Sequence, residues 1–429
     1  MSKNSMSQGP LSGLRVVEFA GLAPGPFAGL ILADWGADVI RVDRPTFNAG
    51  GNVTEDVLAR GKRSVAIDPK TPSGYANVKS LINTADVLLE PFRPGVMERL
   101  GFGPEVFLGD EGSNKKLVYA RLVGFPRGGS HSQLAGHDLN YLALSGVLSL
   151  LPGTPDRPTF PLNLLADFAA GGLSCALGIL LALYERKNSG VGQVVDNDMV
   201  SGTRYISTFA LVNSFQKPHP SDLPTKPVFS PATPTPQTRM RNTLDDGAPF
   251  YTVYTCADGR WMSVGCIEPK FYQIFLGRFL GALEKDERDF MKRKEREGGV
   301  PKLEDQFVRE KWEDTRAFFT EGFKLRGRDY WEGVYRDSDA CTFPVLSPLE
   351  AAKLASTTII ASAQPHPHLS RTPAPGPQSG EWDNTTLAPG KHTREVLKEI
   401  GMGEDEVEKL IKDQVVSVWE EQGRGKSKL

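Results

Sequence analysis

Short apolar runs alternate with stretches of helical spacing over the first 125 residues of the chain. Each run has the length and the β-branched content that are typical of a strand. The runs are Leu14–Phe19, Asp38–Val42, Ser64–Ile67, Val87–Leu89 and Leu117–Leu122. A helix is expected over Phe27–Trp35, where Gly36 ends it. This alternation predicts an α/β fold, with a Rossmann-like large domain built on a parallel sheet with right-handed crossovers.

The rest of the chain predicts a second, smaller domain. Leu139–Tyr184 is very apolar and mostly helical in pattern, and Pro218–Pro236 then holds seven prolines in nineteen residues, as in an extended linker. The runs Tyr251–Tyr254 and Trp261–Val264, separated by the turn Ala257-Asp258-Gly259, predict a hairpin. We therefore expect a large domain over 1–215 and again over 336–429, a proline-rich linker over 216–248, and a small α+β domain over 249–335.

Two later segments are expected at the surface. Glu284–Glu297 carries twelve charges in fourteen positions, which favours a solvated helix or a surface insertion. A second proline cluster, Pro365–Pro377, precedes a helix expected over about Thr393–Ile400.

Charge and composition exclude several classes of protein. The 50 Lys and Arg residues nearly balance the 52 Asp and Glu residues, so a strongly basic nucleic-acid binder is not expected. Phe168–Tyr184 has 17 uncharged residues that include three glycines, and we expect a buried core helix there rather than a membrane span. The four cysteines form no CxxC pair, which argues against a structural zinc site or a disulfide framework.

The two terminal segments bear on localisation. The first residues are polar and lack the apolar core of a secretory signal. The last three residues, Ser427-Lys428-Leu429, match the address that a peroxisomal import receptor reads. We therefore expect a peroxisomal protein.

Two segments, each with one aspartate, contain candidates for acid–base chemistry. His137 and Asp138 stand where a helix is expected to begin, a place that favours a neutral imidazole; alternatively, Asp138 is a helix cap beside a hydrogen-bonded histidine. Asp167 precedes the uncharged Phe168–Tyr184 segment, where it is either an N-cap or a carboxyl group held protonated by apolar surroundings. The glycines of the first loop are four apart, a spacing that does not fit a dinucleotide site.

Seven ordered sequence blocks carry a resemblance to a known family. Gly21–Pro45, GLAPGPFAGLILADWGADVIRVDRP, resembles the N-terminal signature of the type III CoA-transferase superfamily. The blocks that follow resemble its α-methylacyl-CoA racemase branch: RGKRSVAIDPK, LLEPFRPGVMERLG, AGHDLNYLALSG, PLNLLADFAAGG, GAPFYTVYTCADGRWMSVGCIEP and DACTFPVL. The similarity runs from about Leu11 to Ile400, with departures at the proline-rich linker and at the charged insertion.

The resemblance implies a reaction and its residues. It implies a racemase of 2-methyl-branched acyl-CoA thioesters that uses His137 and Asp167 as the two acid–base groups, with Glu268 and Asp138 in supporting roles. Without it, Glu268 reads as a surface charge at the end of a strand. The implied CoA-binding positions are Arg44, Ile67, Asp68, Lys70, Arg93, Gly136 and Tyr141. Lys62 and Arg63 are further candidates by charge alone, and His392 is expected to be structural.

The resemblance also implies partners and leaves a rival function open. It implies no metal and no redox cofactor, with CoA entering as part of the substrate, and an interlocked homodimer with sites between the large lobe of one chain and the small lobe of the other. The main rival is a CoA-transferase that uses Asp167 as a nucleophile, and the GHD block and Glu268 argue against it. A third class, a non-catalytic acyl-CoA-binding protein, is disfavoured because every candidate catalytic residue is present.

Overall fold

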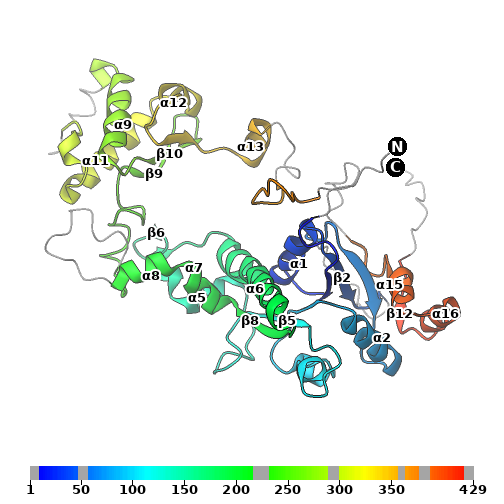
Figure 1. Ribbon diagram of the computed structural model, residues 1–429. Helices are drawn as coiled ribbons and strands as arrows, with labels where there is room; N and C mark the ends of the chain where they lie inside the picture. Colours follow the sequence, from blue (N-terminus) through cyan, green and yellow to red (C-terminus); the bar gives the residue numbers. More distant parts are fainter. Residues whose placement is uncertain are drawn as a thin grey trace, which may run out of the picture. The chain divides into compact units, whose positions relative to one another are not determined.

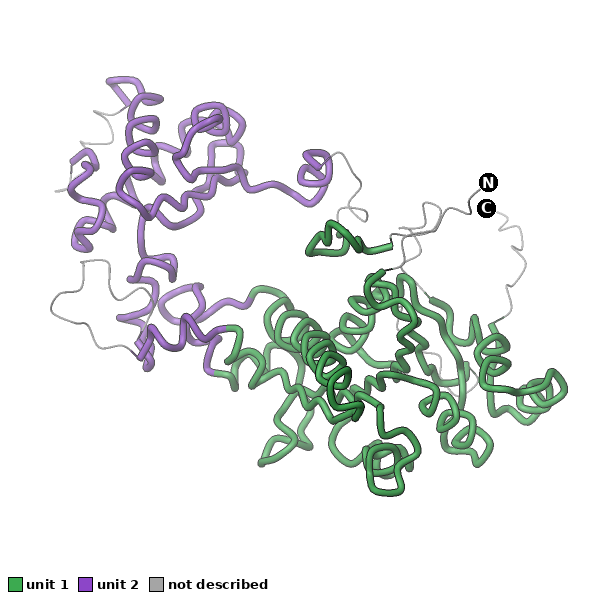
Figure 2. The backbone as a smooth tube through the Cα atoms, viewed as in Figure 1, with its two compact units in different colours: residues 1–145, 161–206, 360–429 green, residues 146–160, 207–359 purple. Residues whose placement is uncertain are grey.

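The computed structural model describes residues 9–46, 57–215, 231–287, 299–355, 363–375 and 387–419. The chain divides into two compact units (Figure 2). Unit 1 is formed by residues 1–145, 161–206 and 360–429, and unit 2 by residues 146–160 and 207–359. Within unit 2, Arg239 donates hydrogen bonds to the carbonyl oxygens of Ser149 and Leu151 and so helps to hold residues 146–160 to the rest of the unit.

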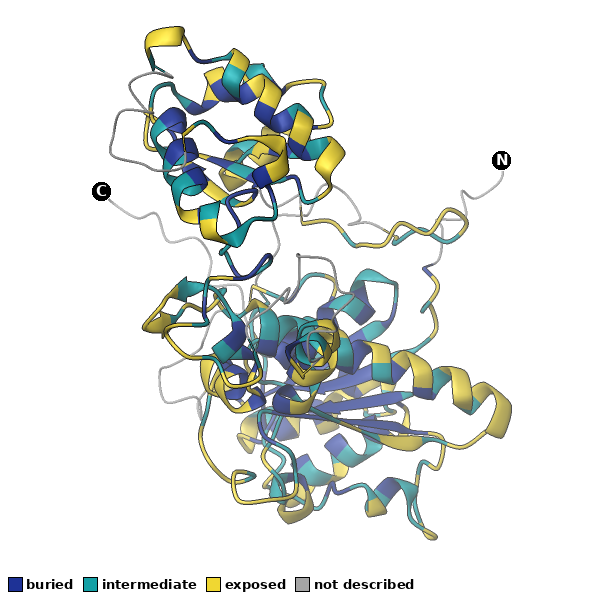
Figure 3. Cartoon of the chain, turned by 90° about the vertical axis from the view of Figure 1, so that its left-hand side faces the viewer, coloured by how far each residue is buried: buried dark blue, intermediate teal, exposed yellow. Residues whose placement is uncertain are grey.

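Unit 1 is built on one seven-stranded sheet (Figure 1). Every pairing in it is parallel except that of β12 with β3. In spatial order the strands are β12 (Val416–Ser417), β3 (Arg63–Ile67), β2 (Asp38–Asp43), β1 (Arg15–Phe19), β4 (Val87–Glu90), β5 (Val118–Val123) and β8 (Gln193–Asp198). The central strands β4 and β5 are buried along their whole length, as parallel strands covered on both faces are (Figure 3).

Ten helical segments belong to unit 1 in the described part of the chain. They are α1 (Pro24–Asp34), α2 (Pro72–Asn83), α3 (Val96–Arg99), α4 (Glu105–Leu108), α5 (Asp138–Ser145), the π-helix η3 (Leu164–Leu173), α6 (Ser174–Ser189), α7 (Met199–Ile206), α15 (Thr393–Glu399) and α16 (Glu404–Lys412).

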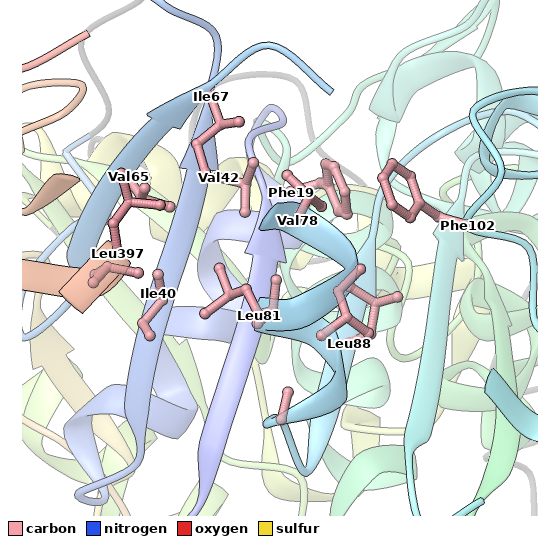
Figure 4. Close-up of a cluster of buried hydrophobic side chains, with 14 of the residues drawn as sticks. Phe19, Ile40, Val42, Val65, Ile67, Val78, Leu81, Leu88, Phe102 and Leu397 are labelled. Carbon is pink, nitrogen blue, oxygen red and sulfur yellow. The ribbon is translucent and has the colours of Figure 1, made fainter. Parts of the chain in front are cut away.

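Successive side chains of a strand point to opposite faces of the sheet. Both faces of this sheet are apolar, and helices cover each of them. On one face Val16 packs with Leu32 of α1 and Ile179 of α6. On the other face Val17 packs with Leu81 of α2 and Leu397 of α15, in the cluster drawn in Figure 4. The α/β class and the five expected strands of the large domain are confirmed.

A buried ion pair links the first and third strands to the start of α1. The side chains of Glu18 on β1 and Lys62 are fully buried, and the Lys62 ammonium donates to both carboxylate oxygens at 3.0 and 2.8 Å. Its third hydrogen bond, 2.8 Å long, goes to the carbonyl oxygen of Pro26. A Cβ atom on Gly29 would lie 1.7 Å from Glu18 Oε2, so only glycine allows α1 to approach the pair. Lys62 is therefore a structural residue and not the exposed CoA ligand that its charge suggested.

Unit 2 has its own sheet and an aromatic core. The antiparallel strands β9 (Tyr251–Thr255), β10 (Trp261–Gly265) and β11 (Thr342–Pro344) pair in the order β11-β10-β9. Rings of Phe275, Phe279, Phe319 and Trp331 fill the core between this sheet and its helices. The other elements are η2 (Val147–Leu150), β6 (Gly153–Thr154), β7 (Arg157–Pro158), α8 (Thr208–Phe215), α9 (Pro269–Gly281), η4 (Leu303–Asp305), η5 (Arg309–Lys311), α11 (Trp312–Phe323), α12 (Arg328–Tyr335) and α13 (Pro348–Leu354).

Several sequence expectations meet a different local structure. The apolar segment 139–184 is interrupted: a 3₁₀ turn and the β6–β7 hairpin separate α5 from η3. The expected hairpin of β9 and β10 is present. Residues 216–230 of the expected linker lie outside the described residues. Residues 288–298, which hold most of the charged segment, and the tripeptide at 427–429 also lie outside them.

One helical stretch, Leu164–Ser189, is long and apolar enough to cross a membrane by length and composition, although core helices of soluble proteins pass the same test. Only 39% of its most apolar window is buried, so the expectation of a buried core helix is wrong for much of its surface. Leu173, Leu177, Leu181 and Tyr184 are each at least half exposed on this chain.

His392 anchors the C-terminal helices to the sheet through a neutral ring. Its Nδ1 accepts a hydrogen bond from the main-chain N–H of Ser64 at 3.1 Å, which a doubly protonated ring cannot do. Burial lowers the pKa of His392, and the nearby cations Lys391 and Arg63 lower it further against the opposing charge of Glu395. The folded state therefore holds the neutral form more firmly than the unfolded chain does.

We predict that acid weakens this anchor. Because the pKa of His392 is lower in the folded state, its contribution to stability is present above the unfolded value of about 6.5 and is lost as pH falls through the folded pKa. Thermal unfolding of wild type and His392→Asn between pH 7.5 and pH 5 measures the effect. The wild type should lose more stability than the variant, and His368→Asn, at an exposed histidine, should behave as wild type. Equal losses in all three proteins would contradict the assignment.

Candidate active site

His137 and Asp138 stand at the start of α5, as the sequence predicts. The exposed His137 precedes the helix, and its carbonyl oxygen accepts hydrogen bonds from the N–H groups of Asn140 and Tyr141. Its own N–H donates to Asn140 Oδ1 at 3.1 Å. His137, rather than Asp138, is thus the capping residue of α5, and the alternative in which Asp138 caps this helix is wrong.

Aromatic packing holds this helix start near the end of β5. The Tyr141 hydroxyl donates to the carbonyl oxygen of Gly136, and the Tyr141 ring meets the Phe125 ring edge-on at 4.9 Å between centroids. Phe125 lies just after β5, so the pair fixes Gly136 and His137 to the carboxyl end of that strand. Burial raises the pKa of Tyr141, and the charge of Asp167 raises it further.

Asp167 lies inside the π-helix η3 and does not cap it. It is the fourth residue of Leu164–Leu173, because the helix begins before the uncharged segment does. A π-helix is a rare element that is frequently found at functional sites. Here Asn197 of β8 donates its side-chain amide to the carbonyl oxygens of Ala170 and Gly171 at 3.1 and 3.2 Å, which satisfies acceptors of the widened turn.

Two glycines of η3 allow it to touch the start of α1. A Cβ atom on Gly171 would lie 2.8 Å from Pro24 Cβ, and one on Gly172 would lie 2.7 Å from Phe27 Cδ1. The Phe27 ring also meets Phe168 edge-on at 5.1 Å. The first turn of α1 therefore serves as a packing surface for the helix that carries Asp167.

Asp138 connects the two candidate acid–base segments. Its Oδ2 accepts hydrogen bonds from the main-chain N–H groups of Ala166, at 2.9 Å, and Asp167, at 2.8 Å. Asp138 therefore caps η3, a helix that starts 26 residues further along the chain, which no local sequence pattern could show. His137 and Asp167 are brought together by this bond.

The surroundings of Asp167 favour its protonated form. Burial raises the pKa of Asp167, and the charge of Asp138 raises it further. The Asn163 amide, which donates to Asp167 Oδ2 at 3.2 Å, and the nearby His137 act in the opposite direction. The balance is a raised pKa, so this carboxyl can hold a proton at a higher pH than an exposed aspartate can.

Most of the predicted CoA-binding residues lie at one edge of the sheet. Arg44 follows β2, Ile67 ends β3 with Asp68 and Lys70 directly after it, and Arg93 follows β4. Because these strands are parallel, their carboxyl ends meet at the edge where α/β folds bind ligands. Arg44, Lys70 and Arg93 are exposed there, and Arg93 donates to the carbonyl oxygen of Gln133 at 3.1 Å.

Other charged residues of the sheet are structural. Arg63 pairs with Asp38, Glu395 and Glu399, so it ties α15 to the sheet rather than facing a ligand. The buried Glu90, which the sequence analysis did not single out, accepts from Arg121 at 2.8 Å, from Arg127 at 2.6 Å and from the N–H of Phe92 at 2.8 Å. It braces the loop that presents Arg93. No group of three or more His, Cys, Asp or Glu suited to a metal ion occurs among the described residues.

Glu268 belongs to unit 2, where it caps α9. It is exposed, and its carbonyl oxygen accepts from the N–H groups of Phe271 and Tyr272. Its charge raises the pKa of the neighbouring Cys341, an effect second to burial. A role beside His137 stays a prediction.

Comparison with known proteins assigns the family. Residues 11–379 match CoA-transferase family III. The chain belongs to CoA-transferase family III. The resemblance found in the sequence blocks is thereby confirmed for the superfamily and for its racemase branch. The chain is 44% identical over 416 residues to a Mus musculus protein named alpha-methylacyl-CoA racemase, and 42% identical to the Homo sapiens protein of that name.

Each of these alignments covers 95% of this chain and 97% of the relative. The solved structure of a CaiB/BaiF family protein from Brucella suis is similar in fold, with a TM-score of 0.63 at 21% identity. That match covers 92% of this chain and all of the other. The fold of this chain is therefore shared with that solved protein over nearly its whole length.

Proposed function

We propose that this protein is an isomerase that interconverts (R)- and (S)-2-methylacyl-CoA thioesters by 1,1-proton transfer. The observation that carries the proposal is the junction of His137 and Asp167 through Asp138, in a chain 42–44% identical to two proteins named alpha-methylacyl-CoA racemase. Inversion next to a thioester needs a base on one face of the α-carbon and an acid on the other. The imidazole of His137 and the carboxyl of Asp167, whose pKa is raised by burial, can form such a pair.

The reaction has two balanced steps. One group removes the α-proton, and the electron pair of the C–H bond moves toward the thioester carbonyl to give an enolate. The other group then returns a proton to the opposite face, which leaves the first group protonated and the second deprotonated. The first turn of α5, at the positive end of its dipole, is placed beside His137 to stabilise the enolate oxygen.

The substrate enters with its CoA moiety at the carboxyl edge of the sheet. Arg44, Lys70 and Arg93 are exposed cations at that edge and suit the phosphates of CoA. CoA is thus part of the substrate and not a resident cofactor. Family III also contains CoA-transferases, for which Asp167 would be the nucleophile that forms an acyl anhydride and then a thioester.

The proposal is tested by incubating the purified protein with one enantiomer of a 2-methylacyl-CoA in heavy water, without an acid acceptor. We expect deuterium at the α-carbon together with loss of optical purity, because protonation from the opposite face inverts the centre. Absence of exchange, with transfer of CoA to an added carboxylate, would contradict the isomerase and favour the transferase.

Single substitutions of the two acid–base groups should each stop inversion. His137→Ala and Asp167→Asn each remove one proton carrier, and we expect a loss of roughly 10²–10⁴-fold in racemisation rate. The matched control is His368→Ala, at an exposed histidine away from α5 and η3 in the sequence, which should keep the wild-type rate. Folded variants of both residues that racemise at the wild-type rate would show that the assignment is wrong.

A second copy of this chain is proposed to cover the apolar face of α6. Leu177 is 50% exposed, Leu181 61% and Tyr184 72%, a concentration that is unusual for the free surface of a soluble monomer. Pairing of two chains would bury these side chains and supply Glu268 to the site. We expect sedimentation to report twice 46.9 kDa. A monomer at micromolar concentration would contradict the dimer.

Import into peroxisomes is the proposed fate of the protein. Ser427-Lys428-Leu429 matches the tripeptide that an import receptor reads, and it lies outside the described residues. Removal of Leu429 should leave an active protein in the cytosol, provided that no full-length copy is expressed to carry it in as a partner. Peroxisomal import of the truncated protein in such cells would refute the signal.

A further inference from the structure

We propose that Asp138 is a positioning residue: one oxygen of its carboxylate fixes the peptide of Asp167 beside the helix start of His137, and its charge faces the Asp167 carboxyl. The inference rests on the proposed function and gives Asp138 a defined role within it. Asp138 is 6% exposed, and it is the first residue of α5. Its contacts therefore join two helices and not two turns of one helix.

The hydrogen-bonding oxygen of Asp138 fixes position. Oδ2 receives two main-chain N–H groups from the first turn of η3, at 2.9 and 2.8 Å. A carboxylate that accepts two such bonds restrains both distance and orientation of the turn. Since Asp167 donates one of the two N–H groups, its Cα is held relative to α5 and so to His137.

The second oxygen of Asp138 makes no such bond. Oδ1 is buried and has no hydrogen-bond partner among the described residues. No ion pair to Asp138 occurs among the described residues either. The carboxylate therefore lies at the junction without a paired cation, next to the peptide that carries the Asp167 carboxyl.

The charge of Asp138 acts on Asp167. The titratable groups that face Asp167 are Asp138, His137 and Tyr141, and the Asn163 amide donates a hydrogen bond to its carboxyl group. Of these, Asp138 is the group whose charge raises the pKa of Asp167, in addition to burial. The same carboxylate thus sets where Asp167 lies and how firmly it holds its proton.

Two substitutions separate these roles. Asp138→Asn keeps an amide oxygen to accept both N–H groups and removes only the charge. Asp138→Ala removes the acceptor as well. Asp198→Asn is the matched control, because Asp198 Oδ1 accepts the Ser201 N–H at 2.7 Å and caps α7 in the same unit.

The readouts are thermal unfolding, kcat and KM for racemisation, and the ¹³C shift of the Asp167 carboxyl against pH, assigned with Asp167→Asn. For Asp138→Asn we expect near wild-type unfolding and a titration of Asp167 that moves to lower pH, because the charge that raises the pKa of Asp167 is gone. For Asp138→Ala we expect kcat to fall by about 10²-fold with little change in KM, since the acid is displaced while the CoA contacts remain. Asp198→Asn should change neither the titration nor kcat.

An Asp167 titration that is unchanged in Asp138→Asn would overturn the role of the charge. Loss of kcat in Asp138→Ala only in proportion to the unfolded fraction would overturn the positioning role. If the wild type fails to exchange the α-hydrogen, the proposed function fails, whereas the titration of Asp167 still decides the action of Asp138 on it. The two failures are therefore distinguishable.

Discussion

The buried ion pair of Glu18 and Lys62 is the interaction on which the placement of the site depends. Lys62 uses its third hydrogen bond to hold the carbonyl of Pro26, and so fixes the first turn of α1 against the sheet. That turn is the surface on which Gly171 and Gly172 of η3 rest. Removing one partner would leave the other charge buried without compensation, a loss of roughly 3–5 kcal/mol. Strand, ion pair, helix start and π-helix form one continuous set of contacts that ends at Asp167.

The local elements of the fold could be predicted from the sequence, whereas the contacts between distant segments could not. The β-branched runs of β1 to β5 are buried on both faces, so their composition alone is enough to predict them as strands. The edge strand β8 (Gln193–Asp198) escaped detection because its half-exposed face carries polar and acidic residues. The short strand β12 was also missed, because two residues form no pattern.

The site shows the same division. His137, Asp138 and Asp167 were identified by residue type and resemblance, and the structure groups them. The alternatives in which Asp138 and Asp167 cap their own helices are wrong, because Asp138 caps a helix that starts 26 residues later and Asp167 lies inside that helix. Lys62 and Arg63 are both cations near a strand and cannot be told apart in the sequence. In the fold, Lys62 pairs with the buried Glu18, whereas Arg63 pairs with acidic residues of α15. Pairing at such separations depends on the tertiary fold.

The central claim is that His137 and Asp167 serve opposite faces of one α-carbon. The most direct test gives each pure enantiomer of a 2-methylacyl-CoA separately to His137→Ala and Asp167→Asn in heavy water. A variant with one remaining base can still exchange the α-hydrogen of the enantiomer that presents it to that base, without inverting the centre. We predict that the two variants exchange opposite enantiomers, each with retention of configuration. Exchange of the same enantiomer by both folded variants would contradict the account.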